Sequence, residues 1–160
     1  MKARVAAFRP LILIFAGFVL VQAVSAAVLF ALKLGLGPAS IESFYRGSAT
    51  AMTRPRSLTG LLEVAVPHLL AVPLTLFIVI HLVGWAGLVA REALQVLARL
   101  SFGLALVGLV AGLGVRYLWP WLSVVKLLAF AGLELTLLAW VLLLVHAFWR
   151  REPQPVDTPG

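Results

Sequence analysis

The chain has 160 residues, of which 62% are hydrophobic and 12% are charged, with a mean hydropathy of +1.07 and a net charge of +7. A soluble globular domain is about half apolar and about a quarter charged. This composition therefore excludes a water-soluble domain and a disordered chain, and it predicts a protein of the lipid bilayer. The lack of cysteine excludes disulfides, thiolate metal sites and a cysteine nucleophile.

The positive charge does not indicate a nucleic-acid-binding protein. Such proteins gather their lysines and arginines on one face or stripe. Here the thirteen basic residues are spread along the chain at the ends of apolar runs. Charges in that position face lipid headgroups, so we expect the lipid bilayer and its anionic lipids as partners and no nucleic acid.

Four segments are long and apolar enough to cross a membrane. A spanning helix needs about 20 mostly apolar residues, and in lipid only helices and closed barrels satisfy the backbone polar groups. Alternating strand patterns are absent, so the sequence predicts an all-α integral membrane protein. Its transmembrane helices are expected at residues 10–34, 61–89, 97–117 and 121–149.

The first predicted helix follows Lys2, Arg4 and Arg9, as the apolar part of a signal peptide would. Its apolar run of about 24 residues is longer than the ~7–15 residues of a signal peptide. A retained helix is therefore favoured over a cleaved signal.

The longest connection, residues 35–60, is predicted to lie outside the cell. Within it, residues 38–44 are expected to form a short amphipathic helix on the membrane surface. Ser40 is the expected N-cap of this helix, and Glu42 is expected in its first turn.

The other connections are short and predict an up-down bundle. One is expected around Arg91 and Glu92, and the other is a tight hairpin at residues 119–121. Short connections make successive helices antiparallel neighbours, so residues 1–151 are predicted to form one four-helix domain. Residues 152–160 contain three prolines without periodicity, which predicts a disordered tail.

The distribution of charge predicts both termini in the cytoplasm of a bacterial inner membrane. The ends of the chain and the second connection carry seven basic residues, against four on the other side. The seven are Lys2, Arg4, Arg9, Arg91, Arg99, Arg150 and Arg151, and the four are Arg46, Arg54, Arg56 and Arg116.

Ionisable side chains inside the spans are the first candidates for function, because each costs ~2.5–3.5 kcal/mol at the bilayer centre. The second span holds two histidines, and the prolines Pro67 and Pro73 are expected to kink it. The candidates are His68, His81 and His146 for binding haem iron, and Glu63 and Glu134 for a proton relay.

The histidines suggest b-type haem, since neutral imidazole is its common axial ligand. His68 and His81 are about 20 Å apart along one helix, which would suit two haems across the membrane. Two obstacles remain: the two rings are about 140° apart on a straight helix, and two bis-histidine haems need a fourth histidine. His81 and His146 are therefore expected to clamp one haem, while His68 needs a symmetry mate, a partner subunit or a ligand other than histidine. Zinc and copper are less favoured because thiolates are absent.

Each candidate also has a structural explanation. His68 can bond to a carbonyl freed by proline or to Glu63, His81 to a neighbouring helix, and His146 to headgroups. Glu134 can be a neutral packing group that bonds to Gln22 or Thr75.

Residues 55–84, with Leu-Glu-Val, Pro-His and Ile-His elements before an apolar run, resemble small bacterial four-helix membrane proteins associated with cytochromes. The resemblance covers about a fifth of the chain. It implies haem b and electron transport. The family pattern has a further histidine shortly before Pro-His, and Ala65 and Val66 stand there instead, which implies that part of the site is lost.

Two functions follow as hypotheses. The first is a small b-type cytochrome-like subunit that passes electrons between the quinone pool and a partner protein. The alternative is a cofactor-free accessory or anchoring subunit, in a homo-oligomer or a larger complex. The pair Gly108 and Gly112 serves either packing within the chain, which is favoured, or homodimerisation. A carrier that uses Glu134 is the weakest hypothesis, and an independent enzyme is less expected than a subunit.

Overall fold

The structure is a computed structural model that describes residues 8–50, 52–87 and 89–149. These residues contain no strand, and only one isolated β-bridge joins Ser48 to Thr53. Four of the helices are long and apolar enough to span a membrane, which confirms the predicted all-α integral membrane fold. The helices are α2 (Arg9–Leu34), α3 (Pro38–Arg46), α4 (Leu58–Ala86), α5 (Arg91–Tyr117) and α6 (Leu122–Trp149).

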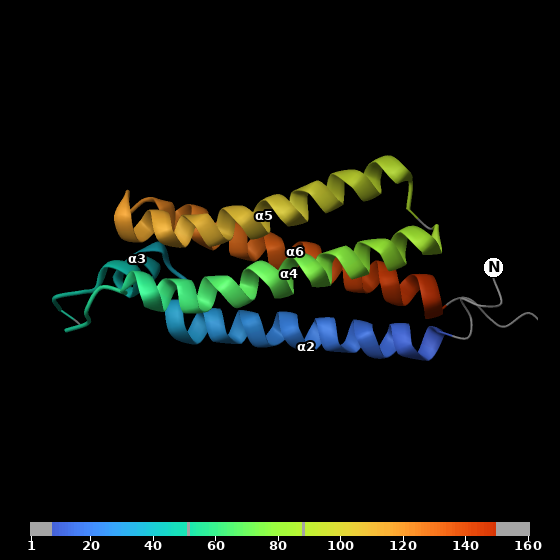
Figure 1. Ribbon diagram of the computed structural model, residues 1–160, viewed down its shortest axis with the longest axis horizontal. Helices are drawn as coiled ribbons and strands as arrows, with labels where there is room; N and C mark the ends of the chain where they lie inside the picture. Colours follow the sequence, from blue (N-terminus) through green and yellow to red (C-terminus); the bar gives the residue numbers. More distant parts are fainter. Residues whose placement is uncertain (1–7, 51, 88, 150–160) are drawn as a thin grey trace, which may run out of the picture.

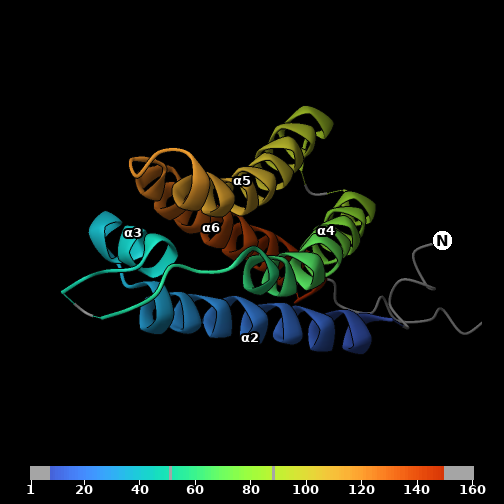
Figure 2. The same cartoon turned by 60° about the vertical axis from the view of Figure 1, so that its left-hand side comes forward.

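The four long helices run up and down, with α6 at the centre (Figure 1). Helix α6 packs against α2, α4 and α5, whereas α4 packs mainly against α5 and α6. Arg9 Nη2 donates a hydrogen bond to the Trp149 carbonyl at 3.1 Å, so α2 begins at the end of the bundle where α6 finishes. Figure 2 shows α4 and α5 leaning away from α2 toward their connection. We call the end of the bundle where α2 begins and α6 finishes the terminal end, and the opposite end the α3 end.

Local chemistry sets the ends of α4. It begins at Leu58, three residues before the predicted start, because the Ser57 hydroxyl accepts a hydrogen bond from the Gly60 N–H at 3.1 Å. It ends at Ala86 because Gly87 adopts a left-handed conformation, with φ of 65°, that only glycine enters at little cost. Pro67 and Pro73 both lie inside this single helix.

Helix α5 begins at Arg91, six residues before the predicted start. Arg91 and Glu92 were expected in a connection, and this prediction is wrong because both belong to the first turn of the helix. Hydropathy finds the part of a helix that lies in lipid, while the helix continues beyond it. Glu92 stabilises that extension by its negative charge near the helix N-terminus.

Helix α3 occupies the predicted place in residues 38–46, but its apolar face packs on the bundle rather than on a membrane surface. Ile41 is fully buried and Tyr45 nearly so, and the helix contacts α2, α5 and α6. The N-cap is Gly37, so the predicted Ser40 cap is wrong. The Ser40 hydroxyl instead accepts from the Gly37 N–H at 3.3 Å and donates to the Gly37 carbonyl at 2.7 Å. The first turn holds no acidic residue, because Glu42 comes one residue too late.

Two apolar clusters form the core. The terminal core lies among α2, α4 and α6 and consists of Ile12, Ala16, Val19, Leu76, Val79, Val83, Ala86, Leu137, Trp140, Val141, Leu144, Ala147 and Phe148. The α3 core consists of Phe30, Ile41, Tyr45 and Val115. Phe30 also stacks on Phe130 with ring centroids 3.9 Å apart. The predicted disordered tail, residues 152–160, lies outside the described residues.

Candidate functional site

The two histidines of α4 are both exposed and have the same local geometry. The His68 Nδ1 lies 2.7 Å from the Val64 carbonyl oxygen, and the His81 Nδ1 lies 2.9 Å from that of Phe77. Each ring is therefore tied to the backbone one turn earlier in its own helix. Among the described residues His68 does not bond to Glu63, and Nε2 of both rings has no hydrogen-bond partner.

The two histidines differ in depth. Helix α4 has 29 residues and is about 43 Å long, while the hydrocarbon core of a bilayer is only ~30 Å thick. With α4 centred in the bilayer, His68 lies about 6 Å from the midplane and His81 about 13 Å from it. His81 thus reaches the edge of the hydrocarbon, where its ring also packs on Phe77 with centroids 4.1 Å apart. His68 remains well inside the hydrocarbon.

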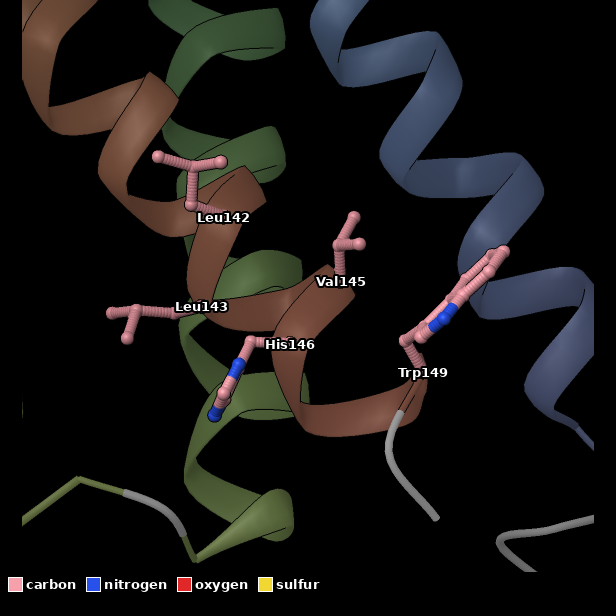
Figure 3. Close-up of a pocket in the computed structure, with 5 residues that line it drawn as sticks. All are labelled: Leu142, Leu143, Val145, His146 and Trp149. Carbon is pink, nitrogen blue, oxygen red and sulfur yellow. The ribbon is translucent and has the colours of Figure 1, made fainter. Parts of the chain in front are cut away.

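His146, which was predicted to bind one haem together with His81, lies near the end of α6. It lines a shallow cavity of about 490 Å³ together with Leu142, Leu143, Val145 and Trp149. All five residues belong to α6, and Figure 3 shows the imidazole pointing away from α2 while Trp149 points toward it. His81 does not line this cavity, so the structure does not bring the two predicted haem ligands into one pocket.

No ready-made metal site is present in the described part of the chain. Nowhere in it do three or more histidine, cysteine, aspartate or glutamate residues form a group that could hold a metal ion. Haem ligation by His68, His81 and His146 stays a prediction.

The two acidic candidates also lie at different depths. Glu134 is half-buried near the middle of α6, while Glu63 is exposed near the start of α4. Among the described residues Glu134 makes no hydrogen bond to Gln22 or Thr75, and Gln22 is exposed. Both helices start at the α3 end, and the difference in depth is about 11 Å, which is too long for direct proton transfer between the two carboxyl groups.

A buried polar pair between α5 and α6 was not predicted from the sequence. The Trp140 Nε1 donates to the Ser101 Oγ at 3.0 Å, and this hydroxyl donates to the Leu97 carbonyl at 2.8 Å. Ser101 and Trp140 are both fully buried. Tryptophan prefers the membrane interface, so a tryptophan in the interior of a span was the available signal.

A second cross-helix bond anchors the lysine of α6. Lys126 Nζ donates to the Gly108 carbonyl of α5 at 2.8 Å. Both glycines of the Gly108–Gly112 pair are buried inside the chain. A methyl group on Gly108 would lie 3.6 Å from the Ala129 Cβ, and one on Gly112 only 2.9 Å from the Tyr45 hydroxyl oxygen. This geometry supports packing within the chain, the favoured use of this pair, over homodimerisation.

Comparison with known proteins bears on the fold. Residues 35–155, which include α3 to α6, match the Aq_1264_TM family, a transmembrane helical domain. The chain belongs to this family. No curated protein and no solved structure matches it significantly. The family supports a multi-pass membrane protein in a lipid bilayer, and it carries no indication of a cytochrome.

Proposed function

We propose that this member of the transmembrane helical domain family is a cofactor-free accessory subunit that works by lateral association in the membrane. The contact surface is the exposed face of α4 around His68. One observation carries the proposal: His68 is exposed inside a membrane-spanning helix, and its Nε2 has no hydrogen-bond partner among the described residues. An unpaired polar atom in lipid costs free energy, which a hydrogen bond to another transmembrane helix recovers.

The surroundings of His68 support the same surface. The exposed residues Leu70, Leu74, Phe77 and His81 lie on the opposite side of α4 from His68, because Leu70 is two residues, or about 200°, away from it around the helix. The side that carries His68 also carries Val64, one turn earlier, whose side chain is exposed. Helix α4 packs mainly against α5 and α6, so this side is covered by no other part of the described chain. The location that the charge distribution favours is the bacterial inner membrane, with both termini in the cytoplasm.

Site-specific crosslinking tests the proposal. The chain contains no cysteine, so Val64→Cys, one turn from His68 on the same side of α4, carries a single thiol to which a photo-crosslinker is attached in native membranes. The matched control is Val28→Cys on α2, which is also apolar and about half exposed. We expect an adduct of one defined mass from position 64, little from position 28, and a several-fold lower yield when His68→Leu is added. Equal yields at both positions, no adduct, or a yield that His68→Leu leaves unchanged contradicts the proposal.

Haem binding is the second candidate, and the ring geometry favours it. A ligating imidazole commonly has its other nitrogen bonded to a backbone carbonyl, as Nδ1 is in His68 and His81. Both histidines are exposed, so haem bound through Nε2 of one of them could take its second axial ligand from another copy of this chain, and it would supply electron transfer there. A reduced-minus-oxidised absorption spectrum of purified protein tests this. Sharp b-type bands that disappear in His68→Ala support it, and a colourless protein after expression with added haem contradicts it.

A further inference from the structure

An apolar groove runs along the outside of the α5–α6 hairpin. Its volume is about 500 Å³, and it extends along α5 from Leu106 to Tyr117. That stretch of helix is about 16 Å long, close to the depth of one leaflet of a bilayer whose hydrocarbon core is ~30 Å thick. The lining residues are Leu106, Val107, Val110, Ala111, Leu113, Gly114, Tyr117, Leu118, Leu122 and Val125. This length and lining suit one acyl chain.

Three arginines gather at the end of this groove. The Arg116 guanidinium carbon lies 5.0 Å from the centroid of the Tyr117 ring, which lines the groove. Arg116 Nε donates to the Arg56 carbonyl at 2.9 Å, and Arg46 Nη1 donates to the Val115 carbonyl at 3.3 Å. These bonds hold the side chains of Arg116 and Arg46 at the last turn of α5, while the Arg56 guanidinium carbon lies 4.3 Å from the centroid of the Phe44 ring of α3.

The arginines lack counter-ions in the described part of the chain. No carboxylate there lies within 4.0 Å of Arg46, Arg56 or Arg116. Each guanidinium has five N–H donors, and no more than one from each is used in the bonds described above. A guanidinium fork matches the geometry of a phosphate group, so this cluster is complementary to an anion that carries phosphate.

The position of the cluster indicates where that phosphate comes from. Trp119 and Trp121 follow α5 directly, are exposed, and stack with ring centroids 6.4 Å apart. Exposed tryptophans mark the interface between hydrocarbon and headgroups. The cations therefore lie at headgroup depth, directly above an apolar groove.

From this juxtaposition we propose that one anionic phospholipid binds at the α3 end of the protein. Its phosphate group is held by Arg116 and Arg56, and one acyl chain lies in the groove between α5 and α6. The apolar groove alone accepts any lipid, and the arginines select the anionic headgroup. The site shares no residue with the exposed face of α4 around His68, so it does not depend on the proposed function.

Tryptophan quenching by brominated lipid tests this site in the full chain. Trp85→Phe and Trp149→Phe are introduced so that, besides buried Trp140, only Trp119 and Trp121 remain. The protein is reconstituted in phosphatidylcholine bilayers that contain a small fraction of either brominated phosphatidylglycerol or brominated phosphatidylcholine. We expect the anionic lipid to bind about fivefold more strongly, as judged from the concentration dependence of quenching. Equal quenching by the two lipids, in the protein that keeps all its arginines, overturns the proposal.

Arginine variants locate the site. Arg116→Gln together with Arg56→Gln is expected to abolish the preference, while Arg116→Lys retains part of it. Arg54→Gln is the matched control. Arg54 lies, like Arg56, in the connection between α3 and α4, where it is exposed and makes no hydrogen bond among the described residues. A preference that survives the double substitution, or one that Arg54→Gln removes equally, contradicts the assignment to Arg116 and Arg56.

A last arm separates lipid from free phosphate. Inorganic phosphate is added at constant ionic strength to the reconstituted protein. We expect no relief of quenching, since free phosphate cannot occupy the groove. Relief by inorganic phosphate would show an anion site without lipid selectivity and would overturn the lipid proposal.

Discussion

At the terminal end of the bundle, α2, α4 and α6 share one large apolar cluster, whereas at the α3 end a short helix closes the bundle and Arg46, Arg116 and Lys126 each bond to a backbone carbonyl. The terminal core is made largely of aliphatic side chains. The α3 core is smaller and is framed by the bonds of Arg46 to the Val115 carbonyl and of Lys126 to the Gly108 carbonyl. The two ends thus differ in the forces that hold the helices together.

This difference reflects what a bilayer provides. Lipid tails are as apolar as leucine, so packing in a membrane depends on close fit rather than on escape from water. The terminal core relies mainly on that fit, to which the Trp140 bond to Ser101 and the Arg9 bond to the Trp149 carbonyl are added. The α3 end adds directional bonds, which fix where α3 sits on α5 and place the arginines beside the groove. The free energy of unfolding is therefore expected to depend mainly on side-chain volume at the terminal end. At the α3 end it is expected to depend more on the hydrogen bonds that side chains make to backbone carbonyls.

The largest effect is expected in the terminal core. Leu144→Ala removes a fully buried side chain and leaves a cavity, which we expect to cost about 2 kcal/mol, the lower part of the range for such changes. The loss is moderate because the transfer contribution is small in lipid. Leu142→Ala, on the exposed side of the same helix, is the control. Thermal unfolding in detergent measures both, and equal losses would mean that the terminal core is not the packed region described here.

A smaller effect is expected where Tyr45 touches α5. A Cβ on Gly112 would lie 2.9 Å from the Tyr45 hydroxyl oxygen, so Gly112→Ala forces the buried ring of α3 to shift. We expect a loss of about 1 kcal/mol. Gly103→Ala on the same helix meets nothing within 4 Å and is expected to be neutral or slightly stabilising. Unfolding temperatures of the two variants decide this, and a reversed order would place α3 elsewhere.

The smallest effect at neutral pH concerns the ionisation of Tyr45. Burial raises the pKa of its phenol from 10.0 to about 12, against a lowering by the nearby Arg56 charge. The folded protein then keeps the proton up to about pH 12, while the unfolded chain loses it near pH 10. Stability is therefore unaffected below pH 10 and falls between pH 10 and pH 12.

Tyrosinate absorbance checks this in Tyr117→Phe, which leaves Tyr45 as the single tyrosine. A titration midpoint near pH 10 would mean that water reaches the α3 core. Adding Tyr45→Phe should abolish the signal, and on its own this substitution should change the unfolding temperature at neutral pH only slightly.

Composition and hydropathy alone determined that the chain is a four-span helical membrane protein, because lipid permits few backbone arrangements and each span must be long and apolar. The short connections likewise determined that the helices alternate in direction. The sequence predicted the ends of α4 and the start of α5 less accurately. The Ser57 cap and the left-handed Gly87 lie outside the apolar pattern that hydropathy detects.

Only the tertiary structure decided which polar side chains meet. The sequence could not show that Trp140 bonds to Ser101 or Lys126 to Gly108, because each bond joins α5 and α6 across a separation of 39 and 18 residues. Nor could it show that His68 and His81 face outward, since the direction of a side chain depends on how its helix rotates against neighbours. The amphipathic pattern of α3 predicted a helix with one apolar face, and packing decided that this face covers the bundle.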